Sequence, residues 1–229
     1  MPAVFSGNAL KILAAIFMTI DHIGVVLFPR VLILRILGRL AMPIFAFMIA
    51  EGCKYTRNRR KYFGMVFGLG AVCQVVYYFF DGSLYLSILI TFSLSILTIY
   101  ALQYLKERNS TFSGVLFLCT VFTVWLLNLI FEIDYGFWGC LLPVFAAIPH
   151  GTKYDSKNTS ITLLGLGLLP LSLSLGDIQI LSLLALPLLY AYNGKRGKWN
   201  LKYFFYIFYP LHLVVLQGIA ELLFLIQNR

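Results

Sequence analysis

Nine apolar segments follow one another along this chain of 229 residues, separated by short breaks rich in charged residues, glycine, proline or asparagine. They cover approximately residues 8–28, 33–52, 62–80, 84–105, 112–131, 136–150, 160–175, 177–192 and 203–226. A helix needs about twenty apolar residues to cross the hydrocarbon core of a bilayer, and a lipid-exposed backbone must satisfy its hydrogen bonds internally. The sequence therefore predicts an all-α fold, a polytopic transmembrane helix bundle of about nine spans that forms one domain over residues 1–229.

Composition supports this class and excludes others. Charged residues make up 12% of the chain, whereas soluble globular domains contain about 25%. The formal net charge is +9, but the basic residues lie in short loops between apolar segments, which indicates membrane topology rather than nucleic-acid binding. The four cysteines match neither a zinc ligand set nor a redox pair, so no metal is expected.

The distribution of lysine and arginine predicts which side of the membrane each loop occupies. Cytoplasmic loops carry an excess of these residues. With a cytoplasmic N-terminus, 14 of the 18 lysines and arginines lie on the cytoplasmic side. The two segments divided at Gly176-Asp177 are short, and we expect either two spans or a re-entrant or broken helix there.

An Asp-His pair lies within the first apolar segment. Ionisable side chains at this depth cost a few kcal/mol each unless they face a partner or a polar cavity. Helix geometry places Asp21 and His22 about 16 Å along the axis beyond Lys11, which lies at the cytoplasmic rim. Adjacent helical residues point about 100° apart, so we expect one of the pair to act and the other to anchor. The alternative is a structural pair that holds the first helix to its neighbours.

The second segment carries two arginines near its outer end. Arg35 and Arg39 are four residues apart and therefore share one helix face. We expect Arg39 to be a counter-ion for Asp21, and Arg35 to extend to the membrane interface. Pro43 is expected to kink this helix and free a backbone carbonyl.

The last segment contains a second histidine at membrane depth. His212 lies about 14 Å into the span, near the bilayer centre. Tyr209 shares its helix face, and Pro210 interrupts the backbone hydrogen bonds beside it. Two intramembrane histidines favour a polar cavity over two unrelated structural features. His150, next to Pro149 in an inner loop, is expected to be solvated.

Two loops carry charge that can bind a substrate. The cytoplasmic loop with Arg57, Arg60 and Lys61 is dense enough to hold a polyphosphate, since arginine forks match phosphate oxygens. Taken alone, the charge of this loop is better explained by membrane topology and binding of anionic lipid. The outer turn with Glu132 and Asp134 can receive an amine or hydroxyl group, although exposed acids need no function.

Together these residues resemble the TraX family of integral membrane proteins, whose founding activity is the N-acetylation of conjugative pilin. The segments that carry the resemblance occur in a fixed order over almost the whole chain: residues 10–24, 38–52, 56–62, 134–136 and 206–212. The pattern is more distantly similar to acyltransferase family 3 and the heparan glucosaminide acetyltransferase. Lys11 and His22 reproduce the spacing of a basic residue and a histidine in family 3, and Arg57 to Arg60 reproduces its Arg-x-x-Arg element.

The resemblance implies an acetyltransferase of the bacterial cytoplasmic membrane with acetyl-CoA as donor and no metal. The residues expected to hold the donor are Lys11, Arg57, Arg60, Lys61 and, deeper, Arg39. His22 would be the base, supported by Asp21, which fixes its tautomer or stabilises the imidazolium. His212 and Tyr209 would carry a second proton or polarise the thioester carbonyl, and an acetyl-His intermediate is an alternative.

The acceptor implied by the resemblance would meet Glu132, Asp134 and Tyr135 from the outer side. It would be the N-terminus of an exported peptide or pilin, or a sugar of the cell envelope, and either N- or O-acetylation fits. A rival function is a proton-coupled transporter or flippase that uses Asp21, His22 and His212 as a relay. The acetyltransferase predicts a basic cavity opening inward beside Lys11 and Arg57, and a third possibility, an assembly factor, predicts no cavity.

Overall fold

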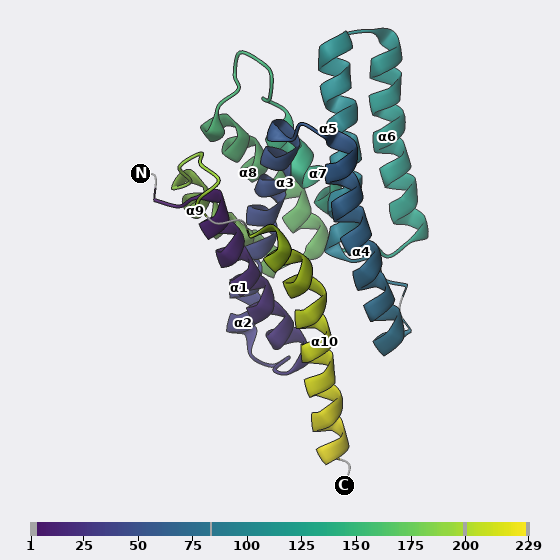
Figure 1. Ribbon diagram of the computed structural model, residues 1–229, viewed down its shortest axis with the longest axis vertical. Coiled ribbons are helices and arrows are strands. Elements are labelled where there is room, and N and C mark those ends of the chain that lie inside the picture. Colours follow the sequence, from purple (N-terminus) through teal and green to yellow (C-terminus); the bar gives the residue numbers. More distant parts are fainter. Residues whose placement is uncertain (1–3, 83, 199–200, 228–229) are drawn as a thin grey trace.

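The computed structural model describes residues 4–82, 84–198 and 201–227, and these residues form helices joined by short loops (Figure 1). The helices are α1 (Gly7–Val26), α2 (Leu32–Gly38), α3 (Ala41–Tyr55), α4 (Arg59–Asp81), α5 (Ile88–Arg108), α6 (Thr111–Ile130), α7 (Gly136–Ala147), α8 (Lys157–Leu175), the 3-10 helix η1 (Asp177–Ala185), α9 (Leu186–Tyr190) and α10 (Lys202–Gln227). Within the described residues, six helices are long and apolar enough to span a membrane when α2 and α3 are taken together, and three shorter apolar helices accompany them. The predicted all-α polytopic fold is confirmed.

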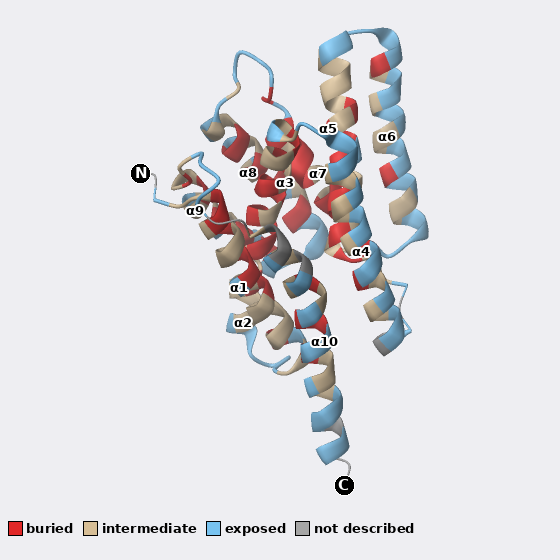
Figure 2. Cartoon of the chain, viewed as in Figure 1, coloured by how far each residue is buried: buried red, intermediate tan, exposed pale blue. Residues whose placement is uncertain are grey.

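Helix α3 is central in the packing. It contacts α1, α5, α7 and α8, and most of its side chains are buried, as Figure 2 shows by their red colour. Helices α4 and α6 lie at the periphery and expose large apolar side chains, as lipid-facing helices do. The turns between α3 and α4 and between α5 and α6 lie at one end of the molecule, and the turn between α1 and α2 lies at the other (Figure 1).

The second predicted segment is broken rather than continuous. Helix α2 ends at Gly38 and α3 begins at Ala41, two residues before Pro43. A proline clashes with the carbonyl four residues earlier and has no N–H to donate, so it kinks or breaks a helix at this point. The expected kink is therefore present as a break, and it places Arg39 in the non-helical turn.

Gly38 lets α1 and α2 approach each other closely. A β-carbon at this position would overlap the carboxylate of Asp21. The close approach brings the Asp21 side chain against the turn that carries the arginines. Small residues at helix contacts serve this purpose in membrane proteins.

The predicted break near Gly176 is also present. Gly176 has a φ of +93° and separates α8 from η1, a conformation that favours glycine. The following nine residues form a 3-10 helix, and Gln179 within it is buried. The segment is thus a broken helix, and it brings an amide side chain to the α2–α3 turn.

His150 is buried at the end of α7, which corrects the expectation that it is solvated. Its Nε2 lies 4.0 Å from Oε1 of Glu51, and neither ring nitrogen has a hydrogen-bond partner among the described residues. Lys54 forms an ion pair with Asp155 at 2.6 Å close by, and Lys106 donates to the carbonyl of His150. Burial, followed by the charge of Lys54, lowers the pKa of His150 to about 4.

We predict that Gly38→Ala lowers the free energy of unfolding by about 1–3 kcal/mol, because the added methyl group displaces the Asp21 carboxylate. Gly64→Ala on α4 is the matched control, since a β-carbon there has open space. Thermal unfolding of the two variants in detergent measures the difference. Equal stability of both variants would contradict the close approach.

We predict that the unfolding temperature falls as the pH is lowered from 7.0 to 5.5. The folded pKa of His150, about 4, lies below its ordinary value of 6.5, so the unfolded chain binds the proton first and stability is lost as the pH decreases. His150→Leu should show a flatter dependence over this range. If the dependence of the unfolding temperature on pH is the same in the variant and the wild type, His150 is not a buried neutral histidine.

Candidate functional site

A cavity of about 710 Å³ lies among α1, α2, α3, α4 and α10 and the two loops that precede α5 and α7. The polar residues that line it come from segments far apart in the sequence. They are Asp21, His22, Arg35, Arg39, Tyr77, Tyr85, Ser87, Glu132, Asp134, Tyr135, Tyr209 and Gln217. Apolar residues such as Val25, Ile88 and Leu213 complete the wall, so the cavity combines apolar surface with converging polar groups, as binding sites do.

Asp21 is held by both arginines of the second segment. Nη1 of Arg35 lies 2.9 Å from one carboxylate oxygen, and Nη2 of Arg39 lies 3.3 Å from the other. The expected Asp21–Arg39 pair is confirmed. The expectation that Arg35 extends to the interface is wrong, because the close approach at Gly38 brings the carboxylate within its reach.

Arg39 makes further contacts that fix its position. Its Nη1 donates to Oε1 of Gln179 at 3.2 Å, and its guanidinium lies 6.0 Å from the ring centre of Tyr135. Arg39 was expected among the residues that hold the donor. In the structure Arg39 lines the cavity beside Asp21. It contacts Gln179 of η1 and Tyr135 of the loop before α7.

His22 points away from Asp21 and toward α10. The Nδ1 atom of His22 lies 2.8 Å from the carbonyl oxygen of Met18. In the neutral imidazole this contact puts the proton on Nδ1 and leaves Nε2 with a lone pair. The carboxylate of Asp21 is occupied by the arginines and makes no hydrogen bond to His22. The expectation that Asp21 fixes the His22 tautomer is therefore wrong, and the Met18 carbonyl takes that role.

His212 lies directly beside His22. Their ring centres are 5.1 Å apart in an edge-to-face arrangement, and Nδ1 of His212 contacts the Phe208 carbonyl at 3.1 Å. Its Nε2 is buried without a hydrogen-bond partner among the described residues. Tyr209 packs against the same imidazole with ring centres 5.4 Å apart, as their spacing predicts. The two intramembrane histidines thus come together from opposite ends of the chain.

The loops before α5 and α7 form one wall of the cavity. A parallel bridge joins Leu86 to Ile133, and the hydroxyl of Tyr85 donates to Oδ1 of Asp134 at 2.6 Å. Burial raises the pKa of Asp134. Glu132 and Tyr135 lie in the same wall, so the three residues expected to meet the acceptor share the cavity with His22.

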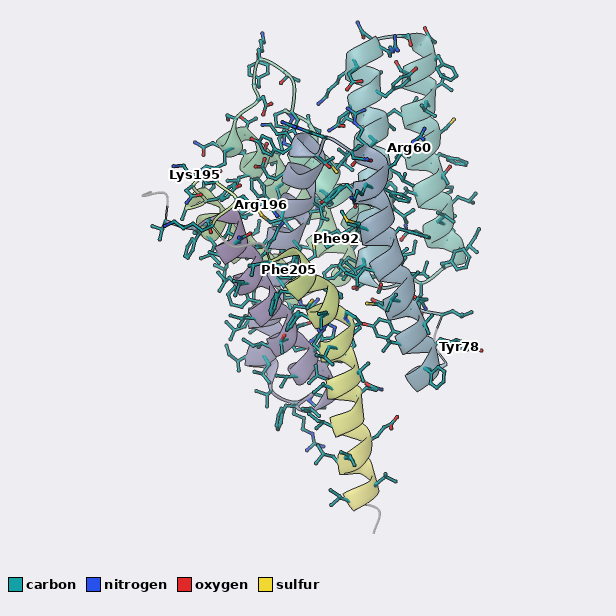
Figure 3. The ribbon with its side chains drawn as sticks, in the orientation of Figure 1. Arg60, Tyr78, Phe92, Lys195, Arg196 and Phe205 are labelled. Atoms are coloured by element: carbon teal, nitrogen blue, oxygen red, sulfur yellow. The ribbon has the colours of Figure 1, made fainter. Side chains whose placement is uncertain are left out.

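Of the five basic residues predicted to hold the donor, only Arg39 lines this cavity. Its lining includes none of Lys11, Arg57, Arg60 and Lys61, and the inward-opening cavity expected beside Lys11 and Arg57 is not the one found in the described part of the chain. Figure 3 shows Arg60 at the beginning of α4 and Arg196 beside the beginning of α1, well apart from each other.

Lys11 has a basic neighbour that the sequence analysis missed. The carbonyl of Arg196 accepts the Asn8 N–H at 2.9 Å, so the loop after α9 covers the first turn of α1. Arg196 lies close enough to act electrostatically on the half-buried Lys11. Two adjacent cations at the predicted cytoplasmic rim favour an anion between them.

Tyr85, Ser87 and Gln179 are further cavity or cavity-contacting residues that were not predicted. Tyr85 and Ser87 alternate with apolar residues at the predicted start of the fourth segment, so the sequence predicts them as part of a membrane span. Gln179 lies in the short segment after Gly176. Gln179 could have been identified from the sequence, because an amide side chain within an apolar segment usually forms a hydrogen bond to a neighbouring helix.

The family described as TraX protein matches residues 6–220 of the chain. The chain belongs to the TraX family. The expected resemblance is confirmed, and the match includes the cavity residues on α1, α2 and α10.

Two relatives are similar to this TraX-family chain. The probable fimbrial assembly protein FimC, serogroup H1, of Dichelobacter nodosus is 29% identical over 245 aligned positions, which cover 93% of this chain and 94% of that protein. An uncharacterized protein of Rickettsia prowazekii (strain Madrid E) is 60% identical over 40 residues, or 18% of this chain and 16% of that protein. No solved structure matches the chain.

We predict that Asp21→Asn lowers the free energy of unfolding by about 3 kcal/mol, because it leaves two partly buried guanidinium groups without their carboxylate. Glu107→Gln is the control, since Glu107 pairs with Arg59 on an exposed surface and such pairs contribute at most about 1 kcal/mol. Unfolding in detergent compares the two. Similar losses in both variants would show that the Asp21 pair does not anchor α1 to α2.

Proposed function

We propose that this protein is an integral membrane acetyltransferase that moves an acetyl group from acetyl-CoA to an amine or hydroxyl of an acceptor. The observation that carries the proposal is the cavity that contains His22, whose Nδ1 is engaged by the Met18 carbonyl and whose Nε2 is left as a proton acceptor. Membership of the TraX family supports the same chemistry.

The base in this proposal is His22. A neutral imidazole with its lone pair on Nε2 takes the proton from the acceptor as the nitrogen or oxygen attacks the thioester carbon. The C–S bond then breaks, and the thiolate of CoA receives that proton from the imidazolium. His212 lies beside His22 and is the second candidate to carry the proton.

The donor would bind with its phosphates at the cytoplasmic end of α1. Lys11 and Arg196 form one basic group there. Arg57, just before α4, and Arg60 and Lys61, in its first turn, form another. The helical rise from Lys11 to His22 is about 16 Å, which a pantetheine arm can span. We assign the phosphates to the Lys11 side, because Lys11 and His22 lie three turns apart on one face of α1.

The acceptor would approach the cavity from the predicted outer side, where Glu132, Asp134 and Tyr135 lie. These residues can bind an amine or hydroxyl group next to His22. The relative FimC is named as a probable fimbrial assembly protein, which supports the N-terminus of a pilin-like protein as acceptor, with an envelope sugar as the alternative. Transfer in this geometry passes the acetyl group outward while CoA stays inside.

The rival proposal of a proton-coupled transporter has less support. It needs Asp21, His22 and His212 to act as one relay, yet the Asp21 carboxylate is bound by the arginines of α2 and makes no hydrogen bond to His22. A proton relay through these three side chains is thus interrupted at its first step.

We predict that the purified protein binds acetyl-CoA and releases free CoA thiol, with labelled acetyl transferred to an acceptor or to water. His22→Ala should lower this rate by about 10²–10⁴-fold, the contribution of a positioned general base. Lys11→Ala and Arg196→Ala should instead raise the KM for acetyl-CoA and have a smaller effect on kcat, since they bind the donor away from the reacting atoms.

The control is Lys153→Ala, a basic residue in the loop after α7 whose side chain is exposed. Radiolabelled acetyl-CoA and a thiol reagent measure transfer and CoA release in parallel. Absence of both acetyl-CoA binding and CoA release in the wild type would overturn the acetyltransferase. Proton-driven transport by the same preparation would favour the rival.

A further inference from the structure

Ser87 carries a hydroxyl group that the fold leaves unused at the cavity. It precedes α5 as the N-cap residue, the position where a serine side chain ordinarily accepts a backbone N–H. Its side chain makes no such bond. The residue is 2% exposed, its Oγ has no hydrogen-bond partner among the described residues, and it lines the cavity that contains His22.

The beginning of α5 is directed at the same cavity. Ser87 and Ile88 both line it, and the helix runs from there for 21 residues. The amides of Ile90 and Thr91 donate to the Ser87 carbonyl, whereas the two amides before them have no acceptor within the helix by geometry. A helix N-terminus carries a partial positive charge, so the first turn of α5 favours negative charge next to it.

The position of this N-terminus relative to the histidines is fixed by packing. Leu89 belongs to one buried cluster with Met18 of α1 and Tyr209 of α10, and Ile88 packs against that cluster. Met18 is the residue whose carbonyl holds His22, and Tyr209 packs on His212. The first turn of α5 and the His22 imidazole therefore border the same cavity from different helices, and His212 packs beside His22.

We propose that Ser87 and the N-terminus of α5 bind the carbonyl oxygen of the acetyl thioester and stabilise it as an oxyanion. This inference rests on the proposed acetyltransferase function and adds a catalytic residue to it. As the acceptor atom bonds to the carbonyl carbon, the π electron pair moves to the oxygen, which accepts hydrogen bonds from the Ser87 hydroxyl and the α5 amides. When the C=O bond re-forms, the C–S bond breaks and CoA leaves.

Other cavity donors suit this role less well. The Tyr85 hydroxyl is committed to Asp134 at 2.6 Å. Arg35 and Arg39 are engaged by Asp21, and His212 is not among the lining residues. A donor that is already desolvated and has no partner in the resting protein gives up no hydrogen bond when it binds the oxyanion, which favours electrostatic catalysis.

The test is Ser87→Ala in the full-length protein, measured by CoA thiol release from acetyl-CoA. We expect kcat to fall by about 10²–10³-fold, the effect of removing one oxyanion donor, with the KM for acetyl-CoA changed less than about threefold. The unfolding temperature should stay the same or rise, because the substitution removes a buried hydroxyl that has no partner. Ser87→Thr retains the hydroxyl and should recover part of the rate.

Ser93→Ala is the matched control. Ser93 is also a buried serine of α5, but its Oγ donates to the Leu89 carbonyl at 2.7 Å, so its loss should not reduce kcat. An active wild type with an equally active Ser87→Ala variant would overturn this inference and leave the acetyltransferase standing. A rate loss matched by a lower unfolding temperature would also overturn it, since that marks a structural cap. A wild type without acetyl-CoA binding and CoA release would overturn both.

Discussion

The ion pair between Asp21 and the two arginines of the second segment determines how the site is built. A carboxylate at this depth is costly without partners, and Arg35 and Arg39 reach it only because Gly38 admits close approach and because the chain breaks before Pro43. With Asp21 directed to α2, the next residue along the helix points about 100° away. His22 therefore faces α10, where His212 lies 5.1 Å from it between ring centres. The anchoring of one side chain orients the other.

Much of the fold could be predicted because lipid imposes a simple rule on the sequence. Segments of about twenty apolar residues must be helical, and the nine predicted segments correspond to the helices observed. The start of the fourth segment was predicted at residue 84, but α5 begins at Ile88. Its first apolar residues instead pair with the loop before α7, through the bridge from Leu86 to Ile133. Hydropathy does not distinguish a buried loop from the first turn of a helix.

The candidate site was predicted in part. Hydropathy and helical spacing identify polar residues within a helix, but they do not identify contacts between helices. His22, His212 and Tyr209 were found because polar side chains within apolar helices are rare and their helical spacing is regular. Arg35, Ser87 and Gln179 depend on contacts between helices, and a sequence does not show which faces meet. His150 was expected in water because it follows a proline in a loop, yet the end of α3 and the loop after α7 bury it.

An intramembrane location suits the proposed chemistry because the apolar walls of the cavity limit the access of water. A thioester can react with water as well as with an amine or hydroxyl, and an apolar wall containing residues such as Val25, Ile88 and Leu213 lowers the water available to compete. The same low polarity strengthens each hydrogen bond to a developing oxyanion. A base on α1 and an oxyanion donor at the start of α5 would then act on the same thioester within one cavity. Asp21 makes no hydrogen bond to the proposed base, and its ion pairs with Arg35 and Arg39 hold α1 against α2.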